Sequence, residues 1–190
     1  MWSRATVEGM LAGFVGALAM TASEKLEQRW THRPDSHVPA RTLERLVGLP
    51  EHPRQQPTSL NLAMHLSQGM LLGGLRGVMA ATGLRGPWAS AMFGVVRLTN
   101  DQILENATGV GAPPWTWPRR ELAVDLLHKG VYAFATGIVA DALAARHGPG
   151  PGQRHAALRP GREADVGPIT GRRVRHAPRS SRATSAGPRA

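Results

Sequence analysis

Two apolar segments of this 190-residue chain carry a small residue at every fourth position, which is the pattern that most restricts how the chain folds. In residues 5–23 and 60–82 these small residues are, respectively, Gly9, Gly13 and Ala17, and Gly69, Gly73 and Gly77. Residues four apart lie on one face of a helix. Glycine weakens a helix in water by up to about 1 kcal/mol relative to alanine, whereas in a bilayer such a face lets two backbones approach closely. The spacing therefore favours helices that pack inside a membrane.

The tryptophans support the same interpretation, because all five stand at the ends of apolar segments: Trp2, Trp30, Trp88, Trp115 and Trp117. Indole has an apolar body and one polar N–H group, so tryptophan concentrates at the two surfaces of a bilayer. A cleavable signal peptide would also begin with a basic residue and an apolar run, but Glu8 inside that run argues against cleavage.

Four helices are predicted along the body of the chain, over residues 5–23, 60–82, 87–109 and 121–145. About 20 residues span a bilayer. Each segment reaches that length only if its ionisable residues lie within the membrane-spanning part of the helix. Short connections make neighbouring helices antiparallel. We expect an all-α, antiparallel four-helix transmembrane bundle, with a soluble four-helix bundle as the alternative. In the linker between the first two helices, the sequence of residues 39–48 predicts a short amphipathic helix that lies on the membrane interface or caps the bundle.

Charge divides the chain into a four-helix membrane domain, residues 1–147, and a basic tail, residues 148–190. The net charge is +10, and residues 146–190 hold ten arginines and two acidic residues, so most of the charge lies there. The tail is rich in glycine and proline and has no apolar periodicity, which predicts disorder. Its arginines suit anionic lipid, whereas the absence of interleaved aromatic residues argues against nucleic acid. The chain has no cysteine, so disulfides and thiolate chemistry are excluded.

Polar side chains recur every three or four residues at one end of each predicted helix. Antiparallel order brings these ends together, and polar stripes inside a membrane face one another rather than lipid. We expect a buried polar cluster formed by Glu24, His65, Arg97, Asp101, Glu105, Asp125 and His128. Arg76 and Asp141 lie toward the opposite end, where we expect them to extend to the membrane surface.

Three chemistries fit this cluster. Asp125-x-x-His128 has the carboxylate–imidazole spacing of dimetal bundles, although in one copy and with Asp in place of Glu. The candidate metal ligands are Glu24, His65, Glu105, Asp125 and His128. A proton or ion path through His65, Glu105 and His128 is the second possibility. In the third, the cluster is structural, with Arg97 pairing with Asp101 and Asp125 with Lys129.

Three stretches of the body resemble a family of uncharacterised small multi-pass membrane proteins of bacteria and fungi: EKLEQRWTHRPDSHVPARTLERLVG (24–48), NLAMHLSQGMLLGGLRGVMA (61–80) and RLTNDQILENATGVGAPPWTWP (97–118). The resemblance covers most of the body and stops at the tail. It implies a four-helix membrane architecture and brings no activity, cofactor or catalytic residue with it.

Phosphate-binding loops, dinucleotide fingerprints and nucleophile motifs are absent from the sequence, which assigns no catalytic residue and no cofactor. We therefore favour a non-enzymatic multi-pass protein of the cytoplasmic membrane of a bacterium, whose main partner is the lipid bilayer. Two alternatives stay open. One is a proton- or ion-coupled transporter that forms a homo-oligomer through the glycine faces, and the other is a metal-dependent membrane oxidoreductase.

Overall fold

The computed structural model describes residues 1–50 and 58–158, and all regular secondary structure within these ranges is helical. The elements, in chain order, are α1 (Trp2–Thr31), α2 (Val38–Val47), α3 (Thr58–Thr82), α4 (Pro87–Ala107), the short 3-10 helix η1 (Pro114–Thr116), α5 (Arg119–Ala145) and α6 (Pro151–Ala157). The prediction of an all-α chain is confirmed. The four long predicted helices and the short one at residues 39–48 all form, and α1 is longer than its apolar segment.

The extension of α1 follows from its sequence. The residues that continue it after Ser23 include Glu, Lys, Leu, Gln and Arg, which are good helix formers. The helix ends where His32 adopts a left-handed conformation with φ of 56°, and the backbone N–H of His32 caps the carbonyl of Gln28 at 2.9 Å. Pro39 is the second residue of α2 and Pro87 the first of α4, and Gly48 ends α2 in the left-handed region.

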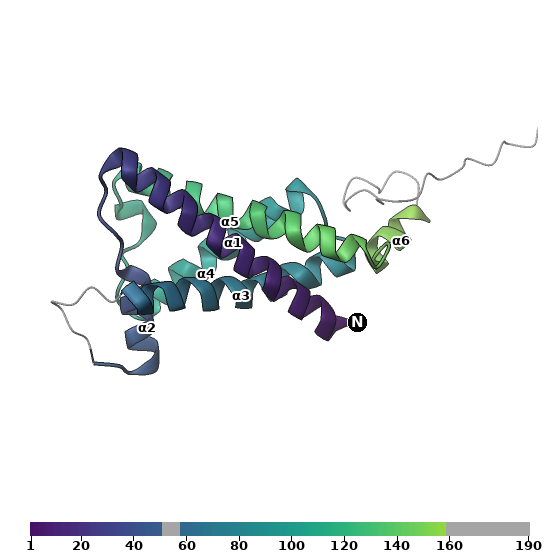
Figure 1. Cartoon of the computed structure of the whole chain (residues 1–190), viewed down its shortest axis with the longest axis horizontal. Coiled ribbons are helices and arrows are strands. Elements are labelled where there is room, and N and C mark those ends of the chain that lie inside the picture. Colours follow the sequence, from purple (N-terminus) through teal and green to yellow (C-terminus); the bar gives the residue numbers. More distant parts are fainter. Residues whose placement is uncertain (51–57, 159–190) are drawn as a thin grey trace, which may run out of the picture.

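The four long helices alternate in direction. α1 crosses α3 and packs along α5, while α4 packs mainly against α5 (Figure 1). Helix α2 lies at one end of the molecule, and α6 lies at the other end, where α1 begins (Figure 1). Because the polar end of each long helix points toward the α2 end, this arrangement brings those ends together.

The two glycine faces, predicted as helix-packing faces, pack directly against each other. Gly9 lies against Gly77, and Gly13 lies against Gly69 and Gly73. A Cβ atom built on Gly73 would lie 2.5 Å from the Cα of Gly13, so even alanine does not fit there. Both glycine faces are therefore buried in a contact within one chain. A homo-oligomer would have to form through other surfaces.

Small and polar residues fill the interior, whereas large apolar residues cover the outside. The buried apolar residues of the described chain are alanines, with four exceptions: Met20, Met64, Phe93 and Tyr132. Leucine, isoleucine and valine are absent from this buried set and recur among the exposed residues of all four long helices. By length and hydropathy, α1 and α5 are the two described helices long and apolar enough to cross a membrane.

Helix α6 corrects the prediction for the tail. Disorder was expected from residue 148 onward, but Pro151–Ala157 is helical and rests on the turn between α3 and α4. Gln153 is buried against Gly83, and the backbone at Gly150 lies against Ala81 and Thr82. A helix this short depends on tertiary contacts, which its own sequence does not reveal. Residues 51–57 of the second linker and 159–190 of the tail lie outside the described residues.

Candidate functional site

A polar cavity of about 460 Å³ opens at the α2 end of the molecule. It lies between the end of α1, the following segment, the start of α3, the second half of α4 and the start of α5. All seven residues of the polar cluster expected from the sequence line it: Glu24, His65, Arg97, Asp101, Glu105, Asp125 and His128. The alternating helix directions bring these seven residues, from four helices, around one volume.

An ion-pair network lines part of this cavity. Asp101 accepts from Arg97 Nε at 3.1 Å and lies 3.2 Å from Lys129 Nζ, which also pairs with Asp125 at 2.8 Å. Gln68 donates to the other oxygen of Asp101 at 2.7 Å. These two pairs, Arg97–Asp101 and Asp125–Lys129, are those expected from their i, i+4 spacing. Since Asp101 and Lys129 are buried, their charges are balanced by these ion-pair partners rather than by water.

The Arg97 guanidinium also stacks on Tyr132, with 5.0 Å between its carbon and the ring centroid. Tyr132 is fully buried, and its hydroxyl donates to the carbonyl of Gly69 at 2.7 Å. The aromatic ring therefore lies against the Arg97 end of the network and ties α5 to the glycine face of α3.

The end of α1 contributes two residues that the sequence analysis did not single out. Glu27 pairs with Arg33 at 3.2 Å and lies 3.7 Å from His128 Nε2. His128 Nδ1 shares a hydrogen bond of 3.1 Å with Ser23. Glu27 stands three residues after Glu24 and therefore on a similar face of the helix, which is the signal that could have identified it.

The segment after α1 is held over the cavity by an ion pair. Lys25 Nζ donates to Asp35 Oδ1 at 2.5 Å, and this hydrogen bond lowers the pKa of Asp35 below its usual value. The carboxylate of Asp35 thus stays charged at neutral pH and adds to the acidic lining of the cavity.

Two partly buried ionisable groups of the lining have no such partner among the described residues. Glu105 is half-buried and forms no ion pair there, while Gly111 of the α4–α5 loop packs against its side chain. His65 Nδ1 is buried without a hydrogen-bond partner. Both groups line the cavity and are free to bind a ligand or a proton.

The charge balance of the lining favours cations. Six carboxylates face three basic side chains, so the net charge is −3 with histidine neutral. The carboxylates are those of Glu24, Asp35, Asp101, Glu105, Glu121 and Asp125, and the basic groups those of Arg33, Arg97 and Lys129.

The metal alternative receives no support from the geometry. Within residues 1–50 and 58–158, no three His, Asp or Glu side chains come close enough to one another to hold a metal ion. The candidates Glu24, His65, Glu105, Asp125 and His128 therefore share a cavity without forming a ligand set, because Lys129, Arg97 and Arg33 lie among them. A carboxylate–imidazole spacing on one helix does not fix its partners on the others.

The expectation for Arg76 and Asp141 is wrong. Arg76 is fully buried and pairs with Asp141 at 2.8 Å, instead of extending to the surface. Pairing across helices was not visible in the sequence, because the two residues are 65 positions apart and lie on α3 and α5.

Comparisons of the chain with known protein families, with curated proteins and with solved structures find no match.

Proposed function

We propose that this chain is a non-enzymatic integral membrane protein in which α1, α3, α4 and α5 cross the bilayer as an antiparallel four-helix bundle. One observation carries the proposal, namely that small and polar residues fill the interior while the mid-helix surface is apolar. The exposed side chains include one near the middle of each long helix: Leu11 (56% exposed), Leu71 (70%), Val95 (62%) and Ile138 (69%).

In water this distribution would be costly, because soluble proteins rarely expose large contiguous apolar surfaces. Burying an arginine such as Arg76 or Arg97 while leaving leucine outside reverses the usual order. In a bilayer the same distribution is favourable, since lipid covers the apolar surface and ionisable groups turn toward the protein interior. It therefore supports a lipid environment for all four helices, including α3 and α4, whose own hydropathy is lower.

The tryptophans add independent support. Trp2 and Trp88 lie at the end where α1 and α4 begin, and Trp30 and Trp115 lie at the opposite end. Each of the four is more than half exposed. Two exposed groups at opposite helix ends suit the two interfaces of a bilayer.

Carbonate extraction tests the proposal. We expect the chain to stay in the membrane pellet, because apolar contact with lipid is insensitive to high pH. A chain attached only through its basic tail would be released, since that attachment is electrostatic. Recovery in the supernatant contradicts the proposal and favours a soluble helical protein.

Ion-coupled transport is the second candidate, and the carboxylate of Glu105, which is unpaired within the described chain and lines the same cavity as His65, favours it. Intramembrane carboxylates and imidazoles are common proton-relay groups. The cavity lies at the α2 end, and its lining residue Arg97 packs on the fully buried Tyr132, so transport requires the interior of the bundle to open. Four spans are few for a monomeric transporter, which points to an oligomer formed through faces other than the glycine ridges.

Proton flux into proteoliposomes tests this candidate. Glu105→Gln should lower the flux at least tenfold, because the amide no longer accepts and releases a proton. Gln102→Ala, on the same helix but outside the cavity, is the matched control and should retain the flux. Equal flux in the wild type and Glu105→Gln would remove the transport candidate.

A further inference from the structure

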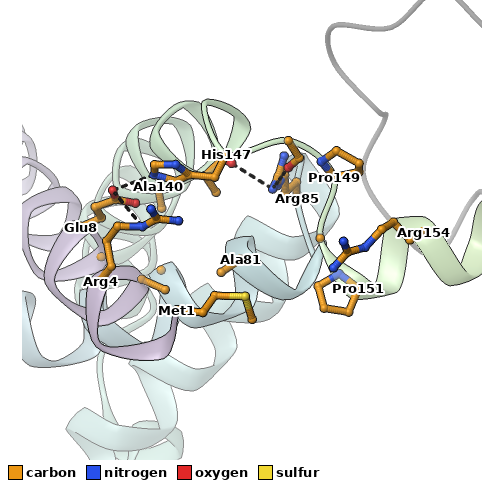
Figure 2. Close-up of a pocket in the computed structure, with 16 residues that line it drawn as sticks. Met1, Arg4, Glu8, Ala81, Arg85, Ala140, His147, Pro149, Pro151 and Arg154 are labelled. Carbon is orange, nitrogen blue, oxygen red and sulfur yellow. Dashed lines mark hydrogen bonds and ion pairs between the residues drawn. The ribbon is translucent and has the colours of Figure 1, made fainter.

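A second cavity, of about 180 Å³, lies at the opposite end of the molecule (Figure 2). The first turns of α1, the ends of α3 and α5, and the start of α6 enclose it. The docking of α6 on the α3–α4 turn places Arg154 on one side of this cavity, across from Arg4 of α1 (Figure 2).

The lining is strongly basic. Arg4, Arg85 and Arg154 line this cavity together with a single carboxylate, that of Glu8. Glu8 is already engaged, since it lies 2.9 Å from His147 Nε2 and 3.9 Å from Arg4 Nε. With His147 neutral, the lining carries a net charge of +2. An anion is therefore the ligand that the lining favours.

Arg85 is the buried arginine of this lining, and its hydrogen-bond partners are neutral. Its guanidinium donates to the carbonyls of Ala80, Ala144 and Gly148, at 2.8 to 3.2 Å, and forms no ion pair with a carboxylate of the described chain. Burial and the nearby charge of Arg76 lower the pKa of Arg85, although Asp141 partly offsets them. A buried cation with neutral partners gains most from an added negative charge.

We propose that this cavity binds a phosphate group, supplied by the head group of a glycerophospholipid. Guanidinium groups match phosphate oxygens with paired, charge-assisted hydrogen bonds. The cavity is smaller than the roughly 300 to 1,000 Å³ typical of sites for drug-sized ligands, which suits a single phosphate. Trp2 and Trp88 at the same end of the molecule favour a membrane interface there. The lipid source rests on the proposed membrane location, whereas the phosphate chemistry does not.

Titration of the full chain in micelles tests the inference, with phosphatidylglycerol in one arm and inorganic phosphate in the other. The variant Arg4→Gln/Arg154→Gln removes two charges of the cavity on exposed side chains, so the fold should survive. The matched control, Arg119→Gln/Arg120→Gln, removes two exposed charges at the other end of the molecule. We expect the cavity variant to bind phosphatidylglycerol at least tenfold more weakly than the wild type and the control.

Equal affinity in all three proteins, or equal loss in both variants, overturns the inference, because binding would then not depend on this cavity. If inorganic phosphate shows the same dependence on Arg4 and Arg154 and the lipid does not, the site takes free phosphate instead, and the lipid source is overturned. Carbonate extraction of the same proteins reports separately on the membrane location. Release of a chain that still binds phosphate through these arginines would contradict the membrane proposal alone.

Discussion

A fully buried arginine, Arg76, connects three parts of the molecule. Its guanidinium pairs with Asp141 of α5 at 2.8 Å and donates to the carbonyl of Leu84 at 3.3 Å. The second oxygen of Asp141 accepts from the backbone N–H of Gly86 at 2.7 Å. The pair therefore holds α3, α5 and the α3–α4 turn together.

Replacing this arginine should be costly. We predict that Arg76→Met lowers the free energy of unfolding by about 3 to 5 kcal/mol, because it leaves the carboxylate of Asp141 without its counter-charge. The double variant Arg76→Met/Asp141→Asn should recover part of the loss, since the remaining amide is uncharged. Thermal or denaturant unfolding in detergent measures both, with the exposed Arg119→Gln as control. A double variant less stable than Arg76→Met would contradict the ion-pair interpretation.

For individual residues, much of the candidate site could be predicted from the sequence, but the ion pairs between different helices could not. The i, i+4 pairs Arg97–Asp101 and Asp125–Lys129 follow from helix geometry and were predicted. The contacts of His128 with Glu27 and of Arg76 with Asp141 depend on how helices are rotated against one another. Helical periodicity gives the face of a residue but not its partner on another helix.

Helices α1 and α3 approach each other backbone to backbone through their glycine faces. Close backbone approach gives extensive van der Waals contact without large side chains, which suits helices whose association gains nothing from expelling water. The four-residue spacing predicted the two packing faces, and their contact explains why glycine and alanine rather than leucine lie between α1 and α3.

Adding one methyl group to this contact tests it. We predict that Gly73→Ala lowers the free energy of unfolding by roughly 1 to 3 kcal/mol, because the new Cβ would overlap the backbone of α1 at Gly13. Gly130→Ala on α5 is the matched control. A Cβ at Gly130 meets no atom within 4 Å, so this variant should unfold at the wild-type temperature or above. Equal thermal stability of the two variants in detergent would show that the glycine contact does not hold the fold.

Among the elements, the five helices with clear signals were predicted, and α6 was not. Apolar periodicity, proline at helix starts and glycine at stops mark α1 to α5 in the sequence. Helix α6 has seven residues, among them proline and glycine, and its stability comes from the contacts of Gly150 and Gln153 with the α3–α4 turn. Such tertiary stabilisation has no local signature.

The molecule as a whole combines an apolar mid-helix surface with polar cavities at both ends. The acidic cavity lies at the α2 end and the basic one at the α6 end. Under the proposed membrane location, each cavity faces one side of the bilayer, and the buried Tyr132 and Arg76–Asp141 pair lie between them. This arrangement follows from four helices of alternating direction whose ionisable residues concentrate near their ends.

Cysteine accessibility tests the lipid environment most directly, because the native chain contains no cysteine. Leu71→Cys and Ile138→Cys would each place a thiol on the exposed mid-helix surface, whereas Ser3→Cys and Thr116→Cys place it at the two ends. In opened membrane vesicles, a water-soluble maleimide should label Cys variants at both ends rapidly. It should label the two mid-helix variants only after denaturation, because lipid covers them. Equal labelling of all four variants before denaturation would contradict the membrane-spanning architecture.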